Sequence, residues 1–313
     1  MDLLRGLAIV LVVLFHAETV IRNDTVPPGW LSLWNEIFSP LRMPAMVFLS
    51  GLLVPRSLGK GAGQYLTGKL RGVGWPYLVW SMLMVALFVA ASPVTGDNWK
   101  PTDIVRAAYN PIEHLWFLYY LLGFYMVALV TRKVPAWLPA SGYLVLASAA
   151  SLAGWTDLRI FGFLGLFFTA GVWLADHPQV LEGLLSSRVA HVAALFGFAA
   201  VVVLAFTFGQ IRYEVLTIPA ICLALLGAIT LARRVPPTRF SAPLRFIGEN
   251  SLVFYLMHYP VLIVSAALAE RFTDSVAVVL AVEIAAGLAA GWAVVVVTQA
   301  VPATNLLFRF PRR

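Results

Sequence analysis

Charged residues are scarce in this sequence of 313 residues. Asp, Glu, Lys and Arg together make up only 12% of it, whereas 60% of the residues are hydrophobic. Soluble domains carry about a quarter charged residues, so a soluble core could not bury this much apolar surface. The composition therefore excludes an ordinary soluble enzyme and favours a protein that lies in a lipid bilayer.

Cysteine is almost absent. Cys222 is the only one and lies in an apolar stretch, so we expect no disulfide framework and a packing role for this side chain. No pair of histidines or carboxylates recurs at ligand spacing on one predicted helix, so we expect no metal site. A glycine-rich phosphate loop is also missing.

Basic residues are present without forming a concentrated patch. The net charge is +7, but the 22 Lys and Arg residues are scattered singly and in pairs between apolar stretches. Nucleic-acid-binding proteins gather such charges on one face or along one helix. We therefore expect no nucleic-acid partner and interpret the basic residues as topology signals.

Long hydrophobic runs recur along the whole chain. A helix of about 20 apolar residues crosses the 30 Å core of a bilayer. Apolar runs between charged or Pro/Gly-rich breaks predict about ten such helices, near 3–21, 38–55, 73–92, 112–130, 136–154, 160–175, 189–208, 214–232, 244–267 and 275–298. The sequence predicts an all-α, polytopic membrane protein with a single transmembrane domain over residues 1–313.

The basic residues between the spans predict its orientation. Counted by alternate loops, 15 of the 22 Lys and Arg residues fall on the side of the N-terminus and 7 on the other side. Cytoplasmic loops carry the excess of positive charge. We therefore expect both termini to be cytoplasmic in a multi-pass protein of the inner or plasma membrane.

Two ionisable residues interrupt the first apolar run. Arg5 lies at its start and His16 deep inside it. Eleven residues of helix separate them by about 16 Å along the axis and leave them within about 20° of the same direction. Ionisable groups at membrane depth are costly and mark functional sites by default. A snorkelling Arg5 and a hydrogen-bonded structural His16 are the alternatives.

This first segment and four later ones resemble the acyltransferase-3 family of integral membrane acyltransferases. DLLRGLAIVLVVLFH (2–16) is similar to the family pattern of Arg or Lys followed after ten residues by His. LRMPAMVFLSGLLVPRS (41–57), GKLRGVGWPYLVW (68–80), HLWFLYYLLGFY (114–125) and FIGENSLVFYLMHYP (246–260) resemble its later segments in order. Leu121 and Leu122 stand where larger cell-wall members carry acidic residues. The chain therefore looks closer to the short members that resemble sugar O-acetylases.

The resemblance implies transfer of an acyl group, often acetyl, from cytoplasmic acyl-CoA to a hydroxyl of a glycan, lipid-linked sugar or small molecule. Arg5, Lys69 and Arg71 fall at the expected cytoplasmic edge, where they can bind the CoA phosphates. We expect acetyl-CoA or another acyl-CoA to be the donor substrate.

The expected general base is His16, because a neutral imidazole can take the proton from the acceptor hydroxyl. A covalent acyl-histidine is the alternative route. Glu249 and His258 are the further catalytic candidates, and the candidates for acceptor binding are Trp116, Tyr119, His114, Ser251 and Tyr255. Packing or interhelical hydrogen bonding would explain the same side chains.

Two other classes of protein fit part of the pattern. A transporter or flippase of a lipid-linked sugar or small anion could use His16 and Arg5 as a proton relay or substrate clamp, but we find no inverted repeat or paired broken helices. A membrane scaffold would leave His16 and the polar face around residues 249–258 without a purpose.

Overall fold

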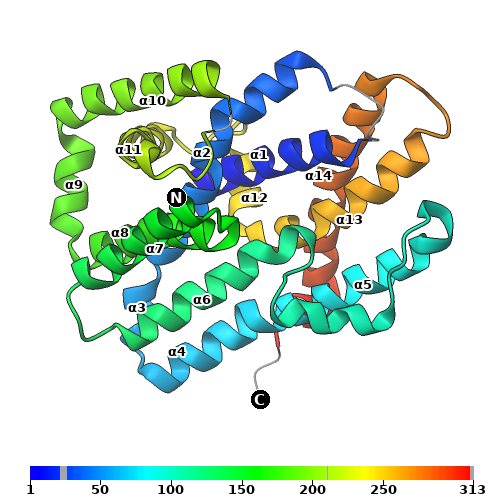
Figure 1. Cartoon of the computed structure of the whole chain (residues 1–313), viewed down its shortest axis with the longest axis horizontal. Helices are drawn as coiled ribbons and strands as arrows, with labels where there is room; N and C mark the ends of the chain where they lie inside the picture. Colours follow the sequence, from blue (N-terminus) through cyan, green and yellow to red (C-terminus); the bar gives the residue numbers. More distant parts are fainter. Residues whose placement is uncertain (22–26, 210, 311–313) are drawn as a thin grey trace. The chain divides into compact units, whose positions relative to one another are not determined.

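The computed structural model describes residues 1–21, 27–209 and 211–310, and within these residues it contains helices and no strand (Figure 1). The chain divides into two compact units. Unit 1 comprises Met1–Gly59 and Val130–Ser251, and unit 2 comprises Lys60–Leu129 and Leu252–Arg313. The expectation of a single domain stays a prediction, and the units are described separately below.

Nine helices in the described part of the chain are long and apolar enough to cross a bilayer. A tenth apolar helix, α7 (Trp137–Ala153), has 17 residues and is about 26 Å long at 1.5 Å per residue. Each of the ten predicted spans overlaps one of these ten helices, with the changes of boundary given below. The prediction of an all-α polytopic membrane protein is confirmed. The side of the membrane on which the termini lie stays a prediction, and Arg22, Arg312 and Arg313 of the charge count lie outside the described residues.

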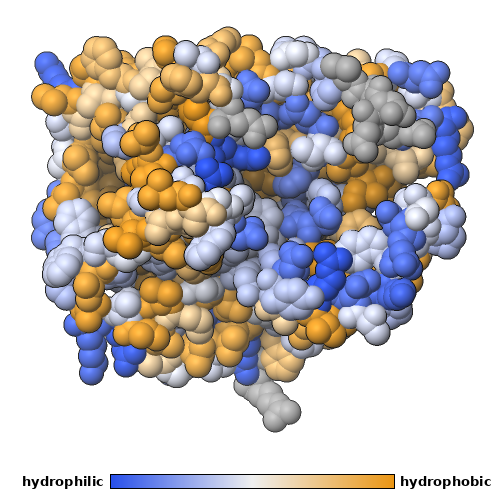
Figure 2. Space-filling model, viewed as in Figure 1, coloured by the Kyte–Doolittle hydropathy of each residue, from blue (hydrophilic) through white to orange (hydrophobic). Residues whose placement is uncertain are grey.

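Apolar side chains cover much of the helix surface. Leu152, Phe196 and Trp292 are exposed on their helices, and hydrophobic residues occupy much of the face drawn in Figure 2. A soluble protein would hide such side chains, whereas lipid solvates them. The surface therefore agrees with a membrane location.

Unit 1 is built around α1 (Asp2–Val20) and α2 (Gly29–Gly51). The rest of its helices are α3 (Val54–Leu58), α7, α8 (Thr156–Asp176), α9 (Pro178–Ser186), α10 (Arg188–Phe208), α11 (Ile218–Arg234) and α12 (Ala242–Glu249). α1 packs against α2 and α12, α2 also packs against α8, and α10 packs against α11. The helix that carries Arg5 and His16 therefore has neighbours from both ends of the unit's sequence.

Reciprocal glycine pairs let two helix pairs of unit 1 touch through their backbones. A Cβ on Gly6 of α1 would lie 1.8 Å from the Leu244 carbonyl oxygen of α12, and a Cβ on Gly248 would lie 1.8 Å from the Asp2 carbonyl oxygen. Gly51 of α2 and Gly171 of α8 make a similar pair. Small residues at such crossings allow the close approach on which membrane helices depend for packing. These contacts fix the position of α1.

Unit 2 contains α4 (Ala62–Lys69), a π-helical turn (Leu70–Gly74), α5 (Trp75–Thr95), α6 (Trp116–Val130), α13 (Ser251–Ala269) and α14 (Val276–Ala300). Short 3₁₀ segments lie at Pro101–Ala108, Glu113–Leu115 and Pro302–Leu307. The indole nitrogens of Trp75 and Trp80 donate to the carbonyls of Leu306 and Leu307 at 2.7 and 2.9 Å. These bonds fasten the C-terminal segment to the start of α5.

The structure changes the expected boundaries in two places. The second span is predicted to begin near residue 38, but α2 already begins at Gly29. Asn35 is buried in this added part of the helix, where its amide donates to Glu18 and to the Leu14 carbonyl. The single span expected near 244–267 is broken at Asn250 into α12 and α13. Polar side chains that bind backbone or each other account for both differences.

Candidate active site

Arg5 and His16 lie on one uninterrupted helix, α1, as the sequence predicts. Their separation is therefore about 16 Å along the axis. A nitrogen of the Arg5 guanidinium lies 3.3 Å from the Asp2 carboxylate, one turn earlier. This ion pair holds the Arg5 head at the beginning of the helix.

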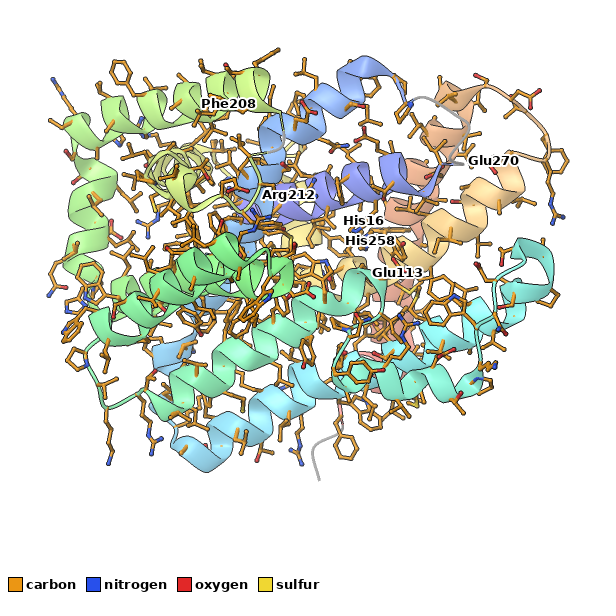
Figure 3. All side chains as sticks on the ribbon, in the orientation of Figure 1. His16, Glu113, Phe208, Arg212, His258 and Glu270 are labelled. Carbon is orange, nitrogen blue, oxygen red and sulfur yellow. The ribbon has the colours of Figure 1, made fainter. Side chains whose placement is uncertain are left out.

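The imidazole of His16 is oriented by its own helix. Its Nδ1 lies 3.0 Å from the carbonyl oxygen of Val12, one turn earlier. A carbonyl oxygen can only accept, so Nδ1 carries the hydrogen of the neutral ring and Nε2 carries the lone pair. The ring is half-buried and meets Phe15 edge-on at 5.1 Å between centroids. Figure 3 labels the position of His16 on α1. Its role as a general base stays a prediction.

Glu249 and Ser251 lie at the other end of α1. Because Gly248 contacts the backbone of Asp2, Glu249 lies beside the first turn of α1 and is exposed. The 14 residues from Asp2 to His16 span about 21 Å of helix. The structure therefore groups Glu249 with Arg5 rather than with His16. The roles of Glu249 and of Ser251, the first residue of α13, stay predictions.

Lys69 of unit 2 is held by two tyrosines. Its ammonium lies 3.9 Å from the Tyr125 ring centroid and 5.3 Å from that of Tyr65. The Tyr65 hydroxyl donates to the Tyr125 carbonyl at 3.1 Å. Cation–π contacts of this kind fix the position of an ammonium without neutralising it. The two aromatic rings thus fix the position of the Lys69 ammonium.

Arg71 lies in the π-helical turn that links α4 to α5. Such turns insert one extra residue and occur often at functional sites. The Arg71 carbonyl accepts from the Phe310 amide at 3.2 Å, and the guanidinium lies 6.0 Å from the Phe310 ring. A Cβ on the next residue, Gly72, would meet nothing within 4 Å. Arg71 itself is half-buried in this turn.

His114, Tyr255 and His258 come together in unit 2. The His114 ring lies 5.3 Å from the His258 ring and 5.5 Å from the Tyr255 ring, and both histidines are buried. The Tyr255 hydroxyl donates to the His114 carbonyl. His258 Nδ1 lies 3.2 Å from the Phe254 carbonyl, so its Nε2 carries the lone pair, as in His16. We call His114, Tyr255, His258 and Tyr259 the histidine–tyrosine cluster.

Tyr259 and Glu113 complete this cluster, and the sequence did not single them out. The Tyr259 ring stacks on His114 at 4.9 Å, and its hydroxyl donates to the Glu113 carboxylate at 2.9 Å. Glu113 has a φ of 47°, which is uncommon for a residue other than glycine. The missed signal was the spacing, since Tyr255, His258 and Tyr259 recur at three and four residues.

The two aromatic candidates of α6 point in different directions. The Trp116 ring packs against Tyr120 at 5.4 Å. The Tyr119 hydroxyl donates to the Ala108 carbonyl at 3.2 Å, and its ring lies 5.7 Å from Tyr77. Tyr119 therefore holds the end of the 3₁₀ segment Pro101–Ala108. A role of Trp116 or Tyr119 in binding an acceptor stays a prediction.

Sequence reasoning also missed Arg42, which it counted only as a boundary charge. The structure buries Arg42 inside α2, where its guanidinium lies 3.9 Å from the Phe15 ring. Arg212, in the loop before α11, contacts the same ring at 5.2 Å. The rule that singles out His16, an ionisable residue within an apolar helix, would have found Arg42 as well.

Across residues 1–21, 27–209 and 211–310, no three His, Cys, Asp or Glu side chains gather closely enough to hold a metal ion. No curated protein and no solved structure matches the chain. The sequence model of the acyltransferase-3 family, described as an acyltransferase domain, matches residues 1–300. The chain belongs to the acyltransferase-3 family and is a multi-pass membrane acyltransferase.

Proposed function

We propose that this acyltransferase moves an acyl group, acetyl in the first instance, from acyl-CoA to a hydroxyl of a glycan, a lipid-linked sugar or another small acceptor. The observation that carries the proposal is the geometry of His16. Its Nδ1 lies 3.0 Å from the Val12 carbonyl oxygen, which in the neutral ring puts the hydrogen on Nδ1 and the basic lone pair on Nε2. Arg5 lies on the same helix, about 16 Å away.

In the proposed reaction, His16 Nε2 takes the proton of the acceptor hydroxyl while the hydroxyl oxygen attacks the thioester carbonyl. The tetrahedral intermediate then collapses, the carbon–sulfur bond breaks, and the imidazolium returns the proton to the departing CoA sulfur. The products are an ester and CoA with a free thiol. Base catalysis of this kind contributes about 10²- to 10⁴-fold to a rate.

Arg5, Lys69 and Arg71 are the proposed ligands of the CoA phosphates. Guanidinium and ammonium groups bind phosphate through charge-assisted hydrogen bonds. Lys69, held between two tyrosine rings, and Arg71, beside the open Gly72, both support this assignment. Binding at the cytoplasmic side of the cell membrane follows from the charge count of the loops and is part of the proposal.

The histidine–tyrosine cluster is the proposed second group of catalytic and acceptor-binding side chains. His258 can act as a base, since its Nδ1 is engaged with the Phe254 carbonyl. His114 and Tyr255 are fixed by the hydrogen bond between the Tyr255 hydroxyl and the His114 carbonyl. Such preorganisation is what stabilisation of a tetrahedral intermediate requires.

The test uses the full chain purified in detergent, [¹⁴C]acetyl-CoA and a panel of hydroxyl-bearing sugars. We expect release of CoA to be coupled to labelling of the sugar. We expect His16→Ala to abolish transfer and to retain binding of acetyl-CoA, while His191→Ala, in α10, retains activity. A His16→Ala protein with the native rate would overturn the assignment. Movement of an unmodified sugar across proteoliposomes, without loss of thioester, would indicate a transporter instead.

A further inference from the structure

Two arginines of unit 1 share one aromatic ring next to His16. The guanidinium carbon of Arg42 lies 3.9 Å from the Phe15 ring centroid, and that of Arg212 lies 5.2 Å from it. The two guanidinium carbons are therefore no more than about 9 Å apart, so both positive charges lie around one side chain. Phe15 immediately precedes His16 and touches its ring. We call Arg42 and Arg212 the arginine pair.

Arg42 is deeply buried and makes little use of its hydrogen-bonding capacity. Arg42 is 3% exposed, and toward the described residues its guanidinium donates a single hydrogen bond, at 3.5 Å, to the Leu11 carbonyl. A guanidinium has five N–H donors. Within the described residues, neither Arg42 nor Arg212 forms an ion pair. A buried charge of this kind is costly unless something pairs with it.

The nearby carboxylates are already engaged with other side chains. Glu18 accepts from the Ser32 hydroxyl at 2.5 Å and from the Asn35 amide. Glu214 is ion-paired with Arg159. Arg42 feels the negative charge of Glu18 and the positive charge of Arg212. Among the described residues, the one carboxylate of Glu18 thus acts on Arg42 from a distance, which leaves the two guanidiniums with an excess of positive charge.

Tyr213 holds Arg212 in place and remains neutral. Tyr213 has a φ of 65°, a left-handed conformation that costs a non-glycine residue about 1 kcal/mol or more. Its buried ring packs edge-on against Phe163 at 5.7 Å. Burial raises the pKa of the Tyr213 phenol, and the charges of Arg212 and Arg42 oppose that rise. The phenol is therefore protonated at neutral pH and does not balance the arginine pair.

Arg212 is the more accessible member of the arginine pair, because Arg42 is buried. Arg212 is half-buried in the loop between α10 and α11. Figure 3 labels its position, and hydrophilic residues gather around that position on the face drawn in Figure 2. The loop count assigns Arg212 to the side of the membrane opposite the termini and therefore opposite the proposed CoA site. A ligand can therefore approach Arg212 from that side.

We propose that the arginine pair binds an oxyanion of the acceptor, so that the acceptor is a hydroxyl-bearing molecule that also carries a carboxylate or a phosphate group. This inference rests on the proposed function. An oxyanion held by Arg42 and Arg212 beside Phe15 brings the rest of the acceptor to the neighbouring His16. Paired arginines recognise carboxylate and phosphate through charge-assisted, often bidentate hydrogen bonds.

The test compares three matched sugars: methyl glucoside, which is neutral, glucuronate, which carries a carboxylate, and glucose 6-phosphate. Binding of each sugar to the purified full chain is measured by isothermal titration without acyl-CoA, and transfer from [¹⁴C]acetyl-CoA is measured separately. The variants are Arg42→Gln, Arg212→Gln and Arg212→Lys. The control is Arg188→Gln, an exposed arginine at the start of α10.

We expect at least one anionic sugar to bind about 10-fold or more tightly than the neutral sugar, because charged recognition penalises the analogue that lacks the charge. Arg42→Gln and Arg212→Gln should each remove that preference, Arg212→Lys should restore part of it, and Arg188→Gln should leave it unchanged. The carboxylate and phosphate arms show which oxyanion the site accepts. If Arg42→Gln fails to fold, Arg212→Gln and Arg212→Lys still test the inference, because Arg212 lies in a loop.

Equal binding of all three sugars, or a charge preference that survives both Gln substitutions, overturns the inference. The proposed function fails by a different result, which is the absence of CoA release from acetyl-CoA with every sugar. An enzyme that acetylates methyl glucoside as well as glucuronate would keep the proposed function and refute the anionic acceptor.

Discussion

Alanine at Gly6 tests how tightly the position of α1 is fixed. The new Cβ would lie 1.8 Å from the Leu244 carbonyl oxygen of α12, whereas real contacts of this kind are essentially never under 3.0 Å. The two backbones must therefore separate by about 1 Å or more, and overpacking of this kind costs about 1–3 kcal/mol. Ala has a higher helix propensity than Gly, which offsets up to about 1 kcal/mol of this cost. We expect a net loss of stability.

The larger effect should be on catalysis. α1 carries Arg5 one residue before Gly6 and His16 ten residues after it. A displacement of about 1 Å in a positioning element can lower a rate about 10²-fold. We therefore expect Gly6→Ala to lower acyl transfer by about that factor, although every proposed site residue is still present.

The assay is transfer from [¹⁴C]acetyl-CoA together with thermal unfolding in detergent. The matched control is Gly142→Ala in α7, where a Cβ would meet nothing within 4 Å. Gly142→Ala should keep its activity and be as stable as the parent or more stable. A Gly6→Ala protein with the parent's melting temperature and rate would refute the reasoning.

Three further predictions concern unit 2. Neither carboxylate oxygen of the buried Glu283 has a hydrogen-bond partner in the described part of the chain, so Glu283→Leu should raise the free energy of unfolding by about 1–3 kcal/mol, measured by denaturant titration in detergent. Tyr259→Phe removes the 2.9 Å hydrogen bond to Glu113. It should lower the free energy of unfolding by about 1 kcal/mol in the same titration. Arg71→Gln should raise the KM for acetyl-CoA about 10-fold with little change in kcat, whereas Lys133→Gln should change neither. An unchanged free energy of unfolding in Glu283→Leu or Tyr259→Phe, or an unchanged KM in Arg71→Gln, would contradict the role given to that side chain.

Much of the fold could be predicted from the sequence because lipid imposes a simple rule. A helix in hydrocarbon must satisfy its backbone internally and present apolar side chains, so each span appears as a long hydrophobic run. The early start of α2 could not be predicted, because Asn35 and Glu18 satisfy each other across two helices. That pairing depends on tertiary contact rather than on any local pattern.

The candidate site was predictable only along single helices. The spacing of Arg5 and His16 follows from helix geometry, and α1 is continuous between them. The contact of Arg42 and Arg212 with Phe15 joins residues far apart in sequence, which spacing cannot show. The place of Glu249 beside Asp2 likewise depends on the reciprocal glycines of α1 and α12.

The central claim is that the two ends of α1 have different functions: Arg5 binds the acyl-CoA donor, and His16 accepts the proton of the acceptor hydroxyl. Steady-state kinetics of Arg5→Gln and His16→Ala with acetyl-CoA separate these roles most directly. We predict that Arg5→Gln raises the KM for acetyl-CoA about 10-fold and spares kcat, whereas His16→Ala lowers kcat at least about 10²-fold and leaves donor binding intact. An equal loss of donor affinity in both variants, or an unchanged kcat in His16→Ala, would contradict the account.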